Sequence, residues 1–265
     1  MRRFDRLVNR LAKTELSLSS IEFSLSQIEE LENVDVKDFE QLKLLGLPLV
    51  KTNDKYATLN TRLTSLEEQI FCVVDIETSS SDVESGQIIE IGALLIKNGK
   101  EIDRLESLVY AREVPPAIEE LTGIDAKQLE NSPSLSSVLE KFRLFLKDHV
   151  FVAHNVGFDY RFISDSFMQC GYGPMLNRKL CTIDLAKKTI KSERYGLEHL
   201  REFLDLEKGE QHRAFWDAYN ANEIFLKCLK NLPKDIFTSE ELIRFSNPNP
   251  RKRKKKKPKK EAKTK

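Results

Sequence analysis

Two carboxylate residues, Asp75 and Glu77, lie two positions apart at the end of an apolar run over residues 70–76. The run is rich in β-branched and aromatic residues, which favours a buried strand. Because side chains on a strand alternate between its faces, both carboxylates share one face. Such a pair is unfavourable away from water unless a cation lies between its members. The pair therefore indicates a divalent-metal site, although two charges at a solvated strand end would also explain it.

Two later stretches place further acids where they could join this pair. Asp159 closes the segment 154–159, in which Gly157 is expected to permit a tight turn that puts Asp159 in the first turn of a helix. His212 and Asp217 are five residues apart, so on one helix they would diverge by roughly 140°. If both face one site, His212 lies in the loop before the helix and Asp217 within it. Taken singly, Asp159 could be an ordinary charge at a helix start and Asp217 half of a salt bridge.

Three motifs together resemble those of a known family. V-D-I-E-T at 74–78, H-N-V-G-F-D at 154–159 and H-R-A-x-x-D at 212–217 resemble, in order and spacing, the DnaQ-like 3′→5′ exonucleases. That family has a ribonuclease-H-like fold and a "DEDDh" site of four acids and one histidine. The resemblance covers about residues 68–232. It implies that two divalent ions, Mg²⁺ or Mn²⁺, are held by four catalytic acids while His212 acts as general base, the acids being Asp75, Glu77, Asp159 and Asp217.

General chemistry supports these implied roles. Hard oxygen ligands suit Mg²⁺ and Mn²⁺, two such ions can serve both ends of a phosphodiester displacement, and imidazole titrates near neutral pH. The implied products are 5′-mononucleotides released from a 3′ end. Residues 116–124 also resemble the family's loop near the substrate terminus. The resemblance implies substrate-binding roles for Thr78, Leu121, Thr122, His154 and Phe158.

The sequence departs from the commonest family pattern directly after Thr78. Many relatives have Thr-Gly or Asn-Gly there, whereas residues 79–81 are all serine. Glycine allows close backbone approach to a nucleotide, while serine adds hydroxyl groups. We therefore expect catalysis to be kept, and the fit around the terminal nucleotide is left open.

The surrounding pattern predicts an α/β domain over residues 67–232. Strands are expected at 70–76, 88–97 and 102–110 as an antiparallel meander, followed by strands at 149–153 and 179–182 that alternate with helices. This order predicts a ribonuclease-H-like mixed five-stranded sheet flanked by helices. Residues 1–66 are expected to form a small, mostly helical module with a hairpin, like a winged helix. Residues 233–265 are expected to be a linker and a disordered lysine-rich tail.

Charge is distributed unevenly along the chain. The net charge is +1, but residues 251–265 hold 11 of the 43 Lys and Arg residues and one of the 42 acids. Residues 1–250 therefore carry 32 bases and 41 acids, so they do not attract a polyanion by their general field. Handling nucleic acid would need metal ions, local basic contacts or the tail. The tail could bind phosphates or merely aid solubility.

Cysteine spacing and hydropathy argue against a zinc protein and against a membrane protein. The four cysteines form no C-x-x-C pair, so zinc is not expected. No apolar run approaches the length of a membrane span, and the first residues show no signal-peptide pattern. These features predict a cytoplasmic protein, associated with the nucleoid if it is bacterial, with no membrane partner.

Three functions fit the sequence. The first is a metal-dependent exonuclease on DNA 3′ ends, in proofreading or repair, with a replicative polymerase subunit as partner. The segment 241–245 is the only clamp-like stretch, and it lacks the expected glutamine. The second is an RNA 3′→5′ exonuclease, because the same acids cut both backbones. The third is a non-catalytic nucleic-acid-binding module, which the complete set of five catalytic residues argues against.

Overall fold

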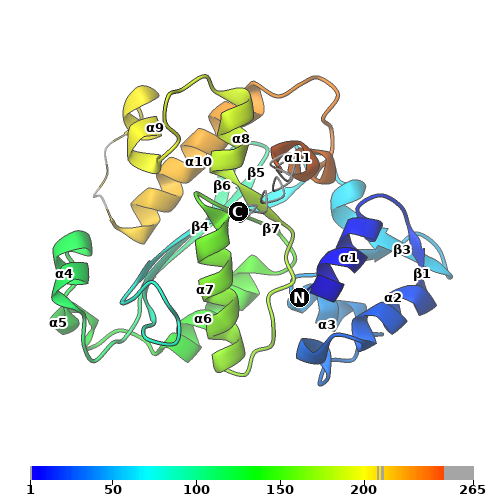
Figure 1. Cartoon of the computed structure of the whole chain (residues 1–265), viewed down its shortest axis with the longest axis horizontal. Coiled ribbons are helices and arrows are strands. Elements are labelled where there is room, and N and C mark those ends of the chain that lie inside the picture. The colour runs from blue at the N-terminus through cyan, green and yellow to red at the C-terminus, as the bar shows by residue number, and fades with distance from the viewer. Residues whose placement is uncertain (1, 208, 210–211, 248–265) are drawn as a thin grey trace, which may run out of the picture.

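The computed structural model describes residues 2–207, 209 and 212–247 (Figure 1). Its centre is a five-stranded sheet in the order β6-β5-β4-β7-β8. The first three strands in the chain form an antiparallel meander, and the last two run parallel with the central strand. The predicted mixed sheet is therefore confirmed. Its strands are β4 (Ile70–Thr78), β5 (Ile88–Lys97), β6 (Lys100–Leu108), β7 (Val150–Ala153) and β8 (Lys179–Cys181).

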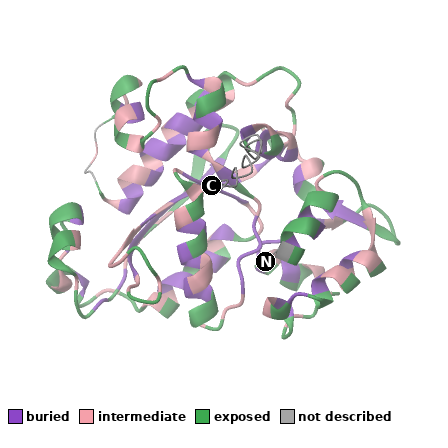
Figure 2. Ribbon diagram, viewed as in Figure 1, coloured by how far each residue is buried: buried purple, intermediate pink, exposed green. Residues whose placement is uncertain are grey.

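Both faces of the sheet are covered by helices. Alternate residues of β4 enter two separate cores, Cys72 and Val74 on one side and Phe71 and Val73 on the other. The first core is closed by α6 (Leu135–Leu146) and α7 (Val156–Gln169), and buried residues accordingly follow the strands and inward helix faces in Figure 2. The second is closed by α8 (Thr182–Thr189), α9 (Leu197–Phe203), α10 (Ala214–Lys230) and α11 (Ser239–Ser246).

Two short helices lie between the meander and α6. The segment expected near a substrate terminus contains α4 (Pro116–Thr122) and is followed by α5 (Ala126–Leu129). Both lie at the far end of the sheet from the N-terminal module (Figure 1). Within the described residues, no helix has the length and apolar character needed to cross a membrane.

The N-terminal residues form a separate small core. Helices and short strands alternate along this segment, and its strands form an antiparallel sheet in the order β1-β3-β2. The amphipathic first helix buries Phe4, Leu7, Val8 and Leu11 in that core. The elements are α1 (Arg2–Leu11), β1 (Leu16–Ser17), α2 (Leu18–Ser26), η1 (Glu29–Leu31), α3 (Phe39–Leu44), β2 (Leu49–Lys51), β3 (Tyr56–Leu59) and η2 (Asn60–Arg62).

Polar contacts fix this module against the α/β domain. The Arg143 guanidinium donates hydrogen bonds to the carbonyl oxygens of Leu45, Tyr172, Gly173 and Pro174, at 3.2–3.4 Å. Gly46, with a φ of 100°, packs so closely on Asn177 that a Cβ atom there would overlap it. The buried Arg143 guanidinium thus has hydrogen-bond acceptors from both regions, and no larger side chain fits at position 46. Together these contacts define one docking geometry.

A second contact between the two regions is made by a buried carboxylate. Glu240 of α11 is 6 % exposed and accepts hydrogen bonds from Arg178, through both Nε and Nη2, and from the Thr61 hydroxyl of the module. Helix α11 therefore helps to hold the module in place, because the carboxylate on it bridges both regions.

The prediction of a linker after residue 232 is wrong over residues 239–246, which form a helix. Helix α11 begins at a capping box formed by Thr238 and Glu241, and it buries Leu242 and Ile243 against α8 and β8. The clamp-like segment 241–245 is thus part of a packed helix rather than an extended peptide. The lysine-rich stretch 251–265 lies outside the described residues.

Candidate active site

The end of β4 brings the two carboxylates of the strand to the face covered by α10. Asp75 is paired across the sheet with Gly92 of β5, and Glu77 with Glu90. Asp159 lies in the first turn of α7 and is 4 % exposed. It is close enough to Asp75 to raise the pKa of that carboxyl by repulsion, so the third acid joins the strand carboxylates at the strand end.

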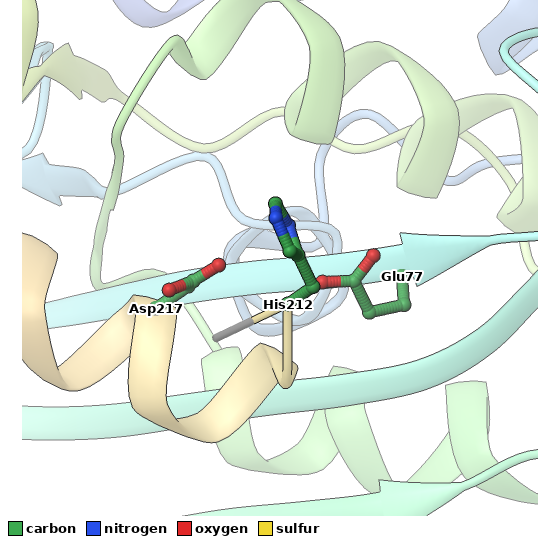
Figure 3. A group of neighbouring side chains, drawn as sticks. All are labelled: Glu77, His212 and Asp217. Atoms are coloured by element: carbon green, nitrogen blue, oxygen red, sulfur yellow. The ribbon is translucent and has the colours of Figure 1, made fainter. Parts of the chain in front are cut away.

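The fourth acid and the histidine come from the start of α10. Side-chain ligand atoms of Glu77, His212 and Asp217 all lie within 4.8 Å of one another (Figure 3). His212 is exposed, has a left-handed φ of 54°, and precedes the helix, whereas Asp217 is in its first turn. The prediction that His212 lies in the loop and Asp217 in the helix is therefore confirmed. The His212 backbone N–H also donates to the Asp217 carboxylate.

The electrostatics of this cluster favour a bound cation. Burial, followed by repulsion from Asp159, Asp217 and Glu77, holds the pKa of Asp75 well above its usual range. Burial and then Asp217 raise the pKa of Glu77 to about 8, and burial raises the pKa of Asp159 to about 7. Burial also raises the pKa of Asp217, against the opposing effects of His212 and Arg201. Four carboxylates that resist ionisation together form a set of hard oxygen donors, which suits a divalent ion.

The turn that delivers Asp159 is made differently from the sequence prediction. Asn155, not Gly157, takes the left-handed conformation before α7, with a φ of 77°. Asparagine tolerates this region better than other residues with a side chain. Gly157 has no positive φ, and a Cβ atom there would meet nothing within 4 Å. The expectation that glycine permits this turn is therefore wrong, although Asp159 lies where it was expected.

The residues expected to bind substrate have varied surroundings. Leu121 is 50 % exposed at the end of α4, while Thr122 is buried and its hydroxyl donates to the Ile118 carbonyl. Phe158 is half-buried and packs on Phe162. Leu121 thus presents the most open apolar surface of this group.

His154 has both ring nitrogens engaged. They lie 2.8 Å from the Thr182 hydroxyl and 3.0 Å from the Tyr195 carbonyl oxygen. Burial lowers the pKa of this imidazole to about 4. The ring is therefore neutral near pH 7 and ties the end of β7 to α8, which leaves no ring nitrogen for a substrate.

The three serines form an internally bonded turn. Thr78 donates its hydroxyl hydrogen bond to the Ser80 carbonyl at 2.7 Å. The Ser79 backbone N–H donates to the Gln87 carbonyl, and the Ser79 hydroxyl accepts from the Gln87 N–H, both at 2.9 Å. These hydroxyls close the loop between β4 and β5 rather than all pointing outward.

Two polar residues of the site escaped the sequence interpretation. Glu90 on β5 is 1 % exposed and pairs with Arg213, which immediately follows His212. Glu90 sits in an otherwise apolar run, 88–96, where a single acid at an inward position is the signal that could have revealed it.

Comparisons with known proteins agree with this geometry. The RNase_T exonuclease family model matches residues 72–225. The DNA polymerase III subunit epsilon of Aquifex aeolicus is 33 % identical over 170 residues, which cover 63 % of this chain and 84 % of that protein. A PolC-type DNA polymerase III of Caldanaerobacter subterraneus is 35 % identical over 216 residues, or 81 % of this chain and 14 % of that protein. The chain thus spans only about one seventh of the PolC-type relatives.

Solved structures share the fold at lower identity. Exonuclease X in complex with 5′ overhanging duplex DNA has a TM-score of 0.54 at 21 % identity, covering 67 % of this chain and 99 % of that one. Escherichia coli exonuclease I in complex with a dA16 oligonucleotide has a TM-score of 0.55 at 17 % identity, covering 62 % and 41 %. The sequence resemblance is thereby confirmed, and the chain belongs to the DnaQ-like exonuclease family.

Proposed function

We propose that this protein is a metal-dependent 3′→5′ exonuclease that acts on DNA 3′ ends and releases 5′-mononucleotides. The observation that carries the proposal is the convergence at the end of β4 of four carboxylates whose pKa values are all raised, with an exposed histidine beside them. Such a cluster opposes its own ionisation, so its stable functional form contains bound cations.

The proposed ligands for two Mg²⁺ or Mn²⁺ ions are the oxygens of Asp75, Glu77, Asp159 and Asp217. When bound, the ions supply Lewis-acid stabilisation of the scissile phosphate. Asp75 is repelled by each of the other three acids, which supports its place in this ligand set. The body of the chain is acidic overall, so substrate binding would depend strongly on metal ions occupying these carboxylates.

His212 is proposed as the general base. Its imidazole is exposed, so water can reach it, and it lies with Glu77 and Asp217 in one cluster. Imidazole accepts a proton near neutral pH, which suits removal of the proton from an attacking water. Its position in the loop before α10 keeps the ring beside Glu77 and Asp217.

DNA is proposed as the substrate because of the named relatives. Subunit epsilon and the PolC-type proteins are parts of DNA polymerase III, and the structural neighbours are described with DNA. By extension we propose proofreading or repair in the cytoplasm, at the nucleoid, with a replicative polymerase subunit as partner. The five residues also support RNA cleavage, so RNA is the competing substrate.

The test is nucleotide release from matched single-stranded DNA and RNA labelled at either end, with Mg²⁺ or with EDTA. We expect mononucleotides from the 3′ end of DNA, no release in EDTA, and no release by the Asp75→Ala variant. A tenfold preference for RNA would make the protein a ribonuclease. Activity of the variant, or activity in EDTA, would contradict the metal mechanism.

A further inference from the structure

The start of α10 is anchored by a buried carboxylate that is not one of the four site acids. Glu90 accepts hydrogen bonds from Arg213, from Nε at 3.1 and 3.2 Å and from Nη2 at 2.7 Å. It also accepts one from the Ala214 backbone N–H at 2.9 Å. This N–H belongs to the first residue of the helix, where backbone donors have no partner within the helix. Glu90 therefore holds both the side chain before the helix and the helix start.

A glycine lets the helix approach the sheet at this same point. A Cβ atom added at Gly92 would overlap the backbone of Ala214 and Phe215. Gly92 is also the residue paired with Asp75 across the sheet, and Glu90 is paired with Glu77. The two residues that fix the start of α10 are therefore the direct cross-strand partners of the two strand carboxylates.

Arg213 connects this anchor to the site in sequence and in space. It follows His212 directly, and its carbonyl oxygen accepts the Asp217 backbone N–H at 3.0 Å. A guanidinium held by three hydrogen bonds to one carboxylate has little freedom. Fixing Arg213 thus restricts His212 on one side and Asp217 on the other.

We propose that Glu90, Arg213 and Gly92 form a bracket that sets His212 and Asp217 at working distance from Glu77 and Asp75. All three are positioning residues, and the proposal rests on the proposed function of the site. A buried ion pair often adds little net stability compared with apolar residues of the same volume, so its use beside four acids points to a geometric role. Because Arg213 balances the charge of Glu90, the bracket adds no net charge to the cluster.

The chain provides a matched control in its other buried pair, Glu240 with Arg178. Each glutamate is nearly inaccessible and each arginine donates through Nε and Nη2. Glu90→Gln and Glu240→Gln both remove one buried charge and keep the shape of the side chain. They differ in that only the first faces the start of α10.

The first experiment compares these two variants by thermal unfolding, exonuclease kinetics and Mn²⁺ binding to the full chain. We expect both to lose stability. For Glu90→Gln we expect kcat to fall by about 10–100-fold with KM for DNA changed less than about threefold, and Mn²⁺ affinity to fall by about tenfold, the size of effect seen when ligand-supporting residues are lost. For Glu240→Gln we expect both quantities within about twofold of wild type.

The second experiment removes the partner and the glycine. Arg213→Gln should lower kcat as Glu90→Gln does, and the double variant should be no worse than either single one, since coupled residues are not additive. Gly92→Ala should lower kcat, whereas Gly196→Ala should leave it unchanged, because a Cβ atom at Gly196 would meet nothing within 4 Å.

The outcomes separate the bracket from the proposed function. If the wild type has no nuclease activity, the function fails and the Mn²⁺ comparison still decides the bracket. Wild-type kcat and Mn²⁺ affinity in a folded Glu90→Gln variant would overturn the bracket. Equal losses in Glu240→Gln would also overturn it, because they would show that the effect follows from stability alone.

Discussion

Buried carboxylates occur in two regions of this molecule, and their surroundings are opposite. Where the N-terminal module meets the exonuclease domain, Glu240 accepts hydrogen bonds from Arg178 and Thr61. At the end of β4, Asp75 and Glu77 face other carboxylates, and their pKa values are raised by burial and by that repulsion. The interface takes its cation from the chain, whereas the site depends on cations from solution.

This difference separates a charge that holds the fold together from charges that the fold tolerates for chemistry. Removing the charge of Glu240 leaves Arg178 buried without its partner, which is destabilising. Removing the charge of a site acid relieves repulsion in the metal-free protein, but it deletes a ligand. A neutral substitute of the same shape should therefore lower stability but keep activity at Glu240. At a site acid it should raise the stability of the metal-free protein but abolish activity.

The largest expected effect is that of Asp75→Asn. We expect exonuclease activity to fall by at least about 10³-fold, since a lost metal ligand removes several kcal/mol of transition-state stabilisation. In EDTA at pH 8 we expect Tm to rise by about 2–4 °C, as relief of about 1 kcal/mol would give in a domain of this size. Nucleotide release and calorimetry measure the two quantities. A lower metal-free Tm would show that this acid is structural, like Glu240.

The His212→Ala variant tests whether His212 acts as the general base rather than as a metal ligand. We expect the rate to fall by about 10²–10⁴-fold, the usual size of general-base catalysis, while Mn²⁺ affinity stays within about threefold of wild type. His199→Ala is the control, because His199 lies on α9, its Nε2 contacts the Ser192 hydroxyl at 3.1 Å, and it is not part of the cluster of Glu77, His212 and Asp217. An unchanged rate in His212→Ala would remove this residue as the base.

Glu240→Gln should do the reverse of Asp75→Asn. We expect the free energy of unfolding to fall by about 3 kcal/mol, because one partner of a buried pair is neutralised. Activity at 25 °C should stay within about twofold of wild type. Urea denaturation and the nuclease assay measure these changes. A large loss of activity in the folded variant would mean that module docking controls the site.

Much of the site was predictable from local sequence. The alternation of side chains on β4 places Asp75 and Glu77 together, and the helical angle between His212 and Asp217 requires one of them to precede α10. Both arguments need only a few neighbouring residues. The meander was predictable for the same reason, since its strands follow one another and turns at Gly86 and Gly99 separate them.

The parts that were missed depend on distant contacts or on a choice between two turn residues. Glu90 and Arg213 are 123 residues apart, so no local pattern reports their pairing. Asn155 takes the left-handed turn conformation that glycine was expected to provide nearby. For α11 the signal was present, because Thr238 and Glu241 have the spacing of a capping box, but the charged composition of the following tail masked it.

The last expected effect concerns the dependence of stability on pH in the absence of metal. The folded Glu77 carboxyl has a pKa of about 8, against an ordinary value of 4.5, and that of Asp159 is raised from 3.8 to about 7. Between the ordinary and the raised values the folded protein keeps protons that the unfolded chain has released. Stability is therefore lost as pH rises from about 4.5 to about 8 in EDTA.

Mg²⁺ should cancel this decline, because it binds the deprotonated acids of the folded state only and stabilises that state by mass action. We expect Tm in EDTA to fall by roughly 10 °C or more between pH 5 and pH 8, because shifts of this size amount to several kcal/mol, and to stay level with saturating Mg²⁺. Asp75→Asn should flatten the EDTA curve, because it removes an acid whose pKa is held well above its usual range in the folded protein and which repels its neighbours when ionised, whereas Glu240→Gln should shift the curve without changing its slope. If Asp75→Asn has the same slope of Tm against pH in EDTA as the wild type, the groups responsible lie outside the site. The contrast between the two regions would then not hold.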